Sequence, residues 1–190
     1  MPVRWDDLFA DMEAQLASQR YREVEAEAAE LTRAETSQAL LEDRCAAHRG
    51  VPIRVSLRGG LRVEGTITSA GSGWVVIEEI GRETLIPLEA VDWVDGLGMG
   101  RQSPEHRRRL GLPHALRALA MARVGARVHL RSGPTVVLEG TVDRAGRDHL
   151  DLALHPGEEF RRRRAVRAVR TVPYAAIACV VAQTGAESAV

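Results

Sequence analysis

Arginine is the residue type whose number and spacing best indicate a chemistry in this sequence. The chain has 190 residues, and all 26 of its Lys and Arg positions are Arg. A guanidinium group binds phosphate through two parallel hydrogen bonds, and neighbouring aromatic rings can stack on bases. The residues that combine these features lie in one stretch near the C-terminus: Phe160, Arg161, Arg162, Arg163, Arg164, Arg167, Arg170 and Tyr174. This stretch is a candidate contact for nucleic acid or for an acidic partner.

The Arg-rich stretch also has a purely structural interpretation. Glu158 and Glu159 directly precede it, so a solvated hairpin could pair these charges across its turn. The N-terminal region is another candidate partner, because residues 1–50 contain 11 acidic residues and 6 Arg, whereas residues 101–190 contain 8 acidic residues and 16 Arg. The formal net charge of zero therefore hides an acidic N-terminal part and a basic C-terminal part. Both interpretations stay open at this point.

Four large aromatic residues are candidate contacts for a protein partner, since aromatic side chains often form the centres of protein interfaces. Trp5 and Phe9 lie on the apolar face of a predicted N-terminal helix, and Trp74 and Trp93 lie in predicted strands. The alternative for Trp74 and Trp93 is that they close the ends of small barrels. The whole chain has 3 Trp, 2 Tyr and 2 Phe, which leaves few rings for stacking on bases.

The sequence lacks the patterns that are typical of catalytic and metal sites. It contains no Gly-x-Ser-x-Gly turn, no phosphate-binding Gly-rich loop and no His-Glu-x-x-His helix. The 6 His residues do not have metal-ligand spacing, and the 2 cysteines, Cys45 and Cys179, lie far apart,. We therefore expect two buried free thiols in a non-enzymatic protein that uses no metal, no cofactor and no small-molecule substrate.

The apolar segments are too short for a membrane-spanning helix. The longest, Ala175–Ala182, is far below the ~18 residues that such a helix needs. The N-terminus carries charged residues at Arg4, Asp6 and Asp7 in place of the long apolar core of a signal peptide,. These features predict a cytoplasmic protein that does not contact a membrane.

Residues 1–49 are predicted to form a long amphipathic helix. The stretch 6–48 is rich in Glu, Ala, Leu, Arg and Gln and contains neither Gly nor Pro, and Gly50 follows as a stop signal,. An apolar stripe with helical spacing includes Trp5, Leu8, Phe9, Met12 and Leu16. The segment Thr32-Arg33-Ala34-Glu35 fits a capping box, which makes a break near residue 32 an alternative to one continuous helix.

From Gly50 onward the apolar pattern has a period of two, which is typical of strands. Ile53, Val55 and Leu57 alternate with polar residues, and Gly59-Gly60 marks a turn,. Five short segments of this kind, separated by turns, occupy residues 50–97. Five short strands joined by tight turns are typical of a small barrel.

The same pattern returns in residues 125–183. Glu64–Gly71 reads EGTITSAG, and Glu139–Gly146 reads EGTVDRAG at an offset of 75 positions. Ile53 and Val55 match Val128 and Leu130 at this offset. Nearer the C-terminus the offset is 86, because Ile86-Pro87 matches Val172-Pro173, so the second copy has 11 additional residues that include the Arg-rich stretch. Self-similarity of this kind predicts a duplicated structural unit.

A helix followed by five such strands resembles the Sm/LSm/Hfq superfamily of small SH3-like barrels. The residues that carry this resemblance are Ile53, Val55, Leu57, Gly60, Gly65 and Ile67. The resemblance covers about 50 residues of each copy, and it implies strand pairing between barrel edges and RNA binding in many members. The chain differs from the family at the positions that contact RNA, which read Gly71, Gly146 and Pro87-Leu88-Glu89 here. No RNA-binding residue is therefore carried over.

Together these patterns predict a mainly β protein with a long N-terminal helix and two tandem Sm-like five-stranded barrels, each preceded by a helix. The barrels are expected at 50–97 and 125–183, joined by a Gly-rich segment and helix at 98–124, and residues 184–190 are expected to form a frayed tail. We expect a binding or adaptor protein that self-associates or binds a protein partner through the barrel edges and the N-terminal helix. The alternative is an RNA- or DNA-binding protein that uses the Arg-rich second barrel.

Overall fold

The computed structural model describes residues 5–37, 39–101, 110–134, 136–155 and 168–183. Within these residues the chain is mainly β, with ten antiparallel strands in one sheet and three α-helices. Residues 1–39 and residues 40–190 form separate compact units, so each is described by itself. None of the helices in the described ranges combines the length and the apolar character that a bilayer-crossing helix needs.

The first unit consists of one helix, α1 (Trp5–Ser37). Neither alternative for residues 1–49 matches the structure: α1 continues through the Thr32–Glu35 segment without a break near residue 32, but it ends at Ser37 and does not reach residue 49 as one helix. Ala, Glu and Arg on both sides of this segment favour helix. A continuous helix with uninterrupted backbone hydrogen bonds is therefore more stable than a helix start capped by a side chain. The next helix, α2 (Leu41–Ala47), follows Leu40, whose backbone is extended, and it belongs to the second unit.

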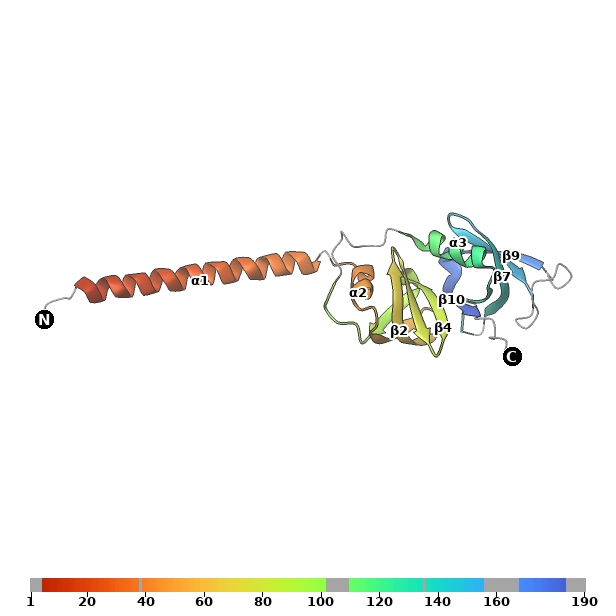
Figure 1. The fold of residues 1–190 in the computed structure, drawn as a ribbon, viewed down its shortest axis with the longest axis horizontal. Helices are drawn as coiled ribbons and strands as arrows, with labels where there is room; N and C mark the ends of the chain where they lie inside the picture. The colour runs from red at the N-terminus through yellow and green to blue at the C-terminus, as the bar shows by residue number, and fades with distance from the viewer. Residues whose placement is uncertain (1–4, 38, 102–109, 135, 156–167, 184–190) are drawn as a thin grey trace. The chain divides into compact units, whose positions relative to one another are not determined.

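The second unit is built on the ten-stranded sheet (Figure 1). Its strands are β1 (Pro52–Leu57), β2 (Arg62–Gly71), β3 (Trp74–Glu79), β4 (Arg82–Pro87), β5 (Val91–Asp95), β6 (Gly125–Leu130), β7 (Val137–Ala145), β8 (His149–Leu154), β9 (Ala168–Pro173) and β10 (Ile177–Gln183). Their order across the sheet is β5-β1-β2-β3-β4-β10-β6-β7-β8-β9, and the sheet does not close on itself. The strands of the two repeated segments are thus joined in one sheet, because β4 pairs with β10.

The two halves of this sheet have the same strand order and similar registers. Gly65 pairs with Ile53 in the first half, and Gly140 pairs with Ala126 in the second. This register makes Ala126 and Val128 the counterparts of Ile53 and Val55, which corrects the match to Val128 and Leu130. The cause is the β6–β7 connection, which is longer than the β1–β2 connection and shifts the sequence match by two positions.

Two glycines permit close packing between strands. A Cβ atom on Gly65 would collide with the carbonyl oxygen of Glu78, and one on Gly140 would collide with the carbonyl oxygen of Ala153. Gly65 also has a φ of 151°, which L side chains rarely adopt,. Each glycine thus lets the second strand of its half cross the third strand at very short range.

Short helices cover the sheet. α2 packs on β2 and β3, and α3 (Leu112–Ala122) packs on β7. The 3-10 helices η1 (Leu88–Ala90) and η3 (Tyr174–Ala176) connect β4 to β5 and β9 to β10. Cys45 of α2 is buried with the core of the first half, and Leu116 of α3 is buried with the core of the second half. A helix therefore precedes and covers each half of the sheet.

The two apolar cores share residues across the β4–β10 pair. Trp74 and Leu85 come from the first half but pack in the cluster that is centred on the second half. Ala178 and Cys179 of β10 pack in the cluster that is centred on the first half. Because each half contributes side chains to the core of the other, we expect the two halves to unfold together.

Ile67 and Val142 test the register of the two halves. Both side chains are buried, and they pair with Ile77 and Leu152 at matching places in the sheet. Truncation of either to Ala should lower the free energy of unfolding by about 1–4 kcal/mol, measured by urea denaturation, because it leaves a cavity in the core. Val169→Ala on β9 is the matched control, since Val169 is exposed and should give a change below about 0.5 kcal/mol,. A neutral result for Ile67→Ala or Val142→Ala would contradict their burial.

Candidate functional site

The β4–β10 pair shows how two strand edges of this chain associate. Leu85 pairs with Val180 and Thr84 pairs with Val181 in antiparallel orientation, and three of the four side chains are buried. This contact joins segments that lie almost 100 positions apart in the sequence. It is an edge-to-edge strand pairing with an apolar centre.

Arg131 strengthens the same junction beside the paired strands. Its Nε donates a hydrogen bond of 2.9 Å to the carbonyl oxygen of Ile177. Its Nη2 lies 2.9 Å from Oε1 of Glu89, which makes an ion pair without hydrogen-bond geometry. Gly59 lies so close to the carbonyl group of Arg131 that a Cβ atom there would collide with it. The two halves therefore meet through backbone, apolar and charged contacts.

Strands β5 and β9 are the two ends of the sheet. On β5, Trp93 is 41% exposed and the Asp92 and Asp95 side chains are exposed. On β9, Val169 is 59% exposed, and Arg170 is exposed beside it. An edge strand presents unpaired backbone N–H and C=O groups that can pair with another strand. These two edges are the candidate functional site of the described chain.

The positions of the two edges in the repeat connect them to the β4–β10 pair. At the offset of 86, β9 corresponds to β4 and β10 corresponds to β5. Thr84 of β4 then corresponds to Arg170 of β9, and Val181 of β10 corresponds to Asp95 of β5. A second chain that docks β9 on β5 in the register of the β4–β10 pair would place Arg170 opposite Asp95.

The structure describes only part of the predicted Arg-rich site. Phe160, Arg161, Arg162, Arg163, Arg164 and Arg167 lie outside the described residues. Arg170 is exposed on β9. Tyr174 is buried in η3, and its hydroxyl donates a hydrogen bond of 3.0 Å to the carbonyl oxygen of Gly146. The prediction that the Tyr174 ring is available for stacking on a base is therefore wrong, because packing and this hydrogen bond hold the ring in the core.

The predicted protein contacts have different outcomes. Trp74 is only 6% exposed, and its Nε1 donates a hydrogen bond of 2.8 Å to the carbonyl oxygen of Leu110, so it is a core residue and not an exposed anchor. Trp93 is partly exposed on the β5 edge, where the guanidinium of Arg62 lies 5.9 Å from its ring. Trp5 and Phe9 lie on α1, where their side chains are outside the described set.

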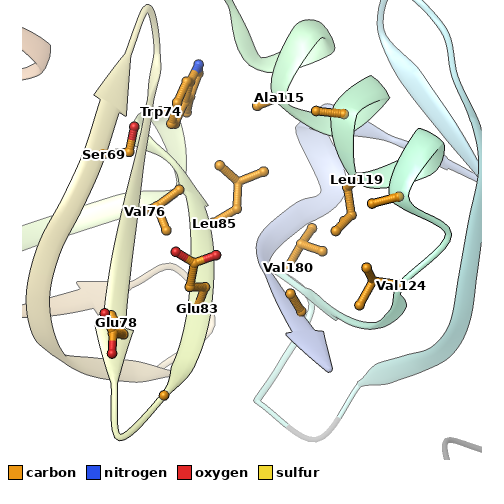
Figure 2. A pocket seen from close by; sticks show the side chains of 14 residues that line it. Ser69, Trp74, Val76, Glu78, Glu83, Leu85, Ala115, Leu119, Val124 and Val180 are labelled. Carbon is orange, nitrogen blue, oxygen red and sulfur yellow. The ribbon is translucent and has the colours of Figure 1, made fainter. Parts of the chain in front are cut away.

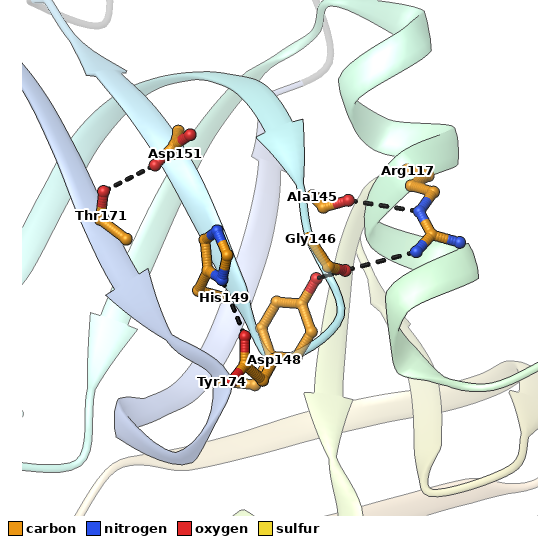
Figure 3. Close-up of polar contacts among 8 residues, drawn as sticks. All are labelled: Arg117, Ala145, Gly146, Asp148, His149, Asp151, Thr171 and Tyr174. Atoms are coloured by element: carbon orange, nitrogen blue, oxygen red, sulfur yellow. Dashed lines mark hydrogen bonds and ion pairs between the residues drawn. The ribbon is translucent and has the colours of Figure 1, made fainter.

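A cluster of polar residues fastens the β7–β8 turn (Figure 3). Arg117 of α3 donates hydrogen bonds to the carbonyl oxygens of Ala145 and Gly146, at 3.2 and 3.4 Å. The exposed Asp148 carboxylate lies 2.8 Å from Nδ1 of His149, and this hydrogen bond lowers the pKa of Asp148. The Arg117 hydrogen bonds hold the turn against α3, and the Asp148–His149 contact lies within the turn itself.

Figure 3 draws two hydroxyl-bearing side chains in the region of the Asp148–His149 pair, Thr171 and Tyr174, and both hydroxyls are engaged in hydrogen bonds. Thr171 donates a hydrogen bond of 2.7 Å to Asp151, and Tyr174 donates its hydroxyl hydrogen to the carbonyl oxygen of Gly146. His149 occupies the position that corresponds to Trp74 in the first half, and its ring packs on Gly146 as the Trp74 ring packs on Gly71. The histidine therefore has a packing role in the described turn.

The cysteines are buried free thiols, as the sequence predicts. Burial raises the pKa of Cys45 to about 11 and the pKa of Cys179 to about 12. Both thiols stay protonated at neutral pH and are poor nucleophiles. Within the described residues, no three His, Cys, Asp or Glu side chains lie close enough together to hold a metal ion.

The sequence patterns did not identify the contacts of Asp95, Glu89 and Arg131. The repeat contains the information needed to find the edges, because the offset of 86 relates the edge strands β9 and β5 to the paired strands β4 and β10. This relation could be interpreted only once the β4–β10 pairing was known.

No family model, no curated protein and no solved structure matches the chain.

Proposed function

We propose that each half of the sheet is an Sm-like small barrel and that the chain is a non-enzymatic binding or adaptor protein that self-associates through its free strand edges. The observation that carries this proposal is the β4–β10 pair. Because β10 is the counterpart of β5 in the repeat, the chain already joins a strand of the β4 type to a strand of the β5 type. The two strands left at the ends of the sheet, β9 and β5, are of the same two types.

The charges of the two edges support a head-to-tail contact. β5 carries Asp92 and Asp95, and β9 carries Arg170. Arg54, the neighbour of Asp95 on β1, already pairs with Glu64, so the Asp95 carboxylate remains the acidic group next to the edge. Opposite charges on facing strands favour one register, whereas like charges disfavour it. Identical edges would repel each other, which argues against pairing of β5 with β5.

A β9–β5 contact between copies would be weaker than the internal junction. Arg131 pairs with Glu89 inside the chain, but the residues at the corresponding positions are Arg58 and Ala175. The contact between copies therefore lacks this ion pair. Because the two contacting surfaces differ, a head-to-tail assembly keeps one free β5 at one end and one free β9 at the other after each copy is added. The assembly therefore grows until it closes as a ring or continues as a filament.

The N-terminal helix is the second contact of the proposed assembly. Met12, Leu16 and Val24 are exposed on α1, and so is Tyr21. An isolated helix obtains most of its stability by packing an apolar face on another surface. The proposed partner of this face is another protein chain, with a second copy as the simplest case.

A charge exchange at the edges tests the proposed function. We expect Arg170→Asp and Asp95→Arg to weaken self-association about ten-fold each, because each places like charges opposite one another. The double variant Arg170→Asp/Asp95→Arg should recover much of the wild-type association, since it restores opposite charges. Analytical ultracentrifugation over a concentration series measures the association constants. Thermal unfolding should change little, because both side chains are exposed and Arg54, the cross-strand neighbour of position 95, keeps its ion pair with Glu64.

Two outcomes would contradict this function. One is a wild-type protein that remains monomeric at the highest soluble concentration. The other is a double variant that associates no better than either single variant, which would show that Arg170 and Asp95 do not face each other.

Nucleic-acid binding is the second candidate function, and the excess of Arg in residues 101–190 favours it. Phosphate contacts release counterions, so log K for a labelled single strand should fall with log salt at a slope of about −3 to −4 for four to six contacts. Replacing Arg161, Arg162, Arg163 and Arg164 with Ser should flatten this slope for all base sequences alike. Under the adaptor function, binding is negligible in physiological salt and the variant changes only association.

A further inference from the structure

A groove of about 640 Å³ lies where the two halves of the sheet meet (Figure 2). One wall is the outer face of β3 and β4, and the other is formed by α3 and β10. Trp74, Val76 and Leu85 face the groove from the first wall, and Leu119 and Val180 face it from the second. This volume falls within the range of small-molecule sites, which are mostly apolar with a few polar groups that orient the ligand.

Three alanines and one leucine on one face of α3 line the groove. Ala115, Ala118, Leu119 and Ala122 follow the i, i+3, i+4, i+7 spacing of one helix face, and all four line the groove. The Leu116 side chain of the same helix is fully buried in the core of the second half. α3 therefore buries Leu116 in the core and turns a second, mostly alanine face toward the groove,.

Two carboxylates stand on the wall of this apolar groove. Glu78 and Glu83 are direct cross-strand partners on β3 and β4, so they share one face of the sheet, and both side chains are exposed. Among the described residues, neither carboxylate has a hydrogen-bond or ion-pair partner. Like charges that face each other across two strands are destabilising. A cation placed beside both carboxylates would remove this repulsion.

We propose that the groove binds a small amphiphilic cation: an ammonium group beside Glu78 and Glu83, with an alkyl chain along Val76, Leu85 and Leu119. The two carboxylates favour a positively charged head group, and the apolar walls favour a hydrocarbon chain. None of the lining residues lies on β5 or β9, so this site is independent of the edges used for assembly. A neutral apolar ligand or a partner helix in the groove would not need the two carboxylates.

Calorimetric titration of the full chain with n-decylammonium chloride, below its micellar concentration, tests this site. We expect saturable binding that the double variant Glu78→Gln/Glu83→Gln weakens at least about ten-fold, because amides keep the shape but lose the charge. Glu79→Gln is the matched control, since Glu79 neighbours Glu78 but lies on the opposite face of β3, and it should leave binding unchanged. 1-Decanol should bind more weakly than the amine and equally to all three proteins.

A variant that fills the groove provides a second measurement. Ala118 is exposed on α3, so Ala118→Phe should fold normally, as judged by circular dichroism, and should abolish binding of the amine. The proposal is overturned if n-decylammonium shows no saturable binding, if the double Gln variant binds it as well as the wild type, or if folded Ala118→Phe retains full affinity.

Discussion

Replacing Gly140 with Ala is expected to unfold the sheet at temperatures where the wild-type protein is folded. The new Cβ atom would collide with the Ala153 carbonyl oxygen, and backbone cannot move aside as a flexible side chain can. β7 would then have to separate from β8, which breaks ladder hydrogen bonds and opens the core around Val142 and Leu152. We expect a loss of at least about 3 kcal/mol in the free energy of unfolding, measured by urea denaturation.

Gly133 supplies the control for Gly140. Nothing lies within 4 Å of a Cβ atom at Gly133, and its φ is outside the range that L side chains avoid. Gly133→Ala should therefore leave stability within about 0.5–1 kcal/mol of the wild type. A stable Gly140→Ala variant would mean that β7 and β8 are farther apart than the structure has them. Gly65→Ala should resemble Gly140→Ala, with added strain from its φ of 151°.

Replacing Trp74 with Ala should have the second large effect, because this one side chain belongs to both halves. It lies on β3 of the first half, packs in the core cluster of the second half and donates its Nε1 hydrogen to Leu110. Its removal leaves a cavity at the junction and should cost about 3–5 kcal/mol. Because the halves share core residues, thermal unfolding followed by circular dichroism should move to lower temperature as one transition.

Trp93→Ala is the matched control for Trp74→Ala. Trp93 is the same residue type on β5 but is partly exposed, so its removal should cost less than about 1.5 kcal/mol in dilute protein,. If Trp74→Ala split the transition into two, the halves would be independent domains and the shared core would not couple them.

These variants also separate assembly from folding. Gly140 and Trp74 act on the interior of one chain, whereas Arg170 and Asp95 lie on exposed edges. A variant that loses association but unfolds like the wild type therefore indicates a change at the edges. A variant that loses both association and stability indicates a change in the core. Ala118→Phe should change neither property, and Glu78→Gln/Glu83→Gln should leave association unchanged while slightly raising stability, because it removes the repulsion between the two carboxylates,.

The local elements of this protein can be predicted from its amino-acid sequence. Alternation of apolar and polar residues predicts the strands, and the glycines at 65 and 140 mark the places where strands cross closely. These features depend on the side-chain period and on turn chemistry, which act over a few residues. The long helix also follows from composition. It continues past residue 32 to Ser37, because the helix propensity of the flanking residues outweighs the capping motif.

The edges that meet and the aromatic residues that stay exposed follow from long-range packing, which local sequence patterns do not specify. Leu85 and Val180 pair although they lie almost 100 positions apart in the sequence, and no local pattern specifies such a contact. This pairing buries Trp74, leaves Trp93 on an edge and brings α3 to the wall of the groove that carries Glu78 and Glu83. The physical reason is that burial depends on what covers a side chain. Trp74 and Trp93 lie in similar strands, and the second half of the chain covers only one of them.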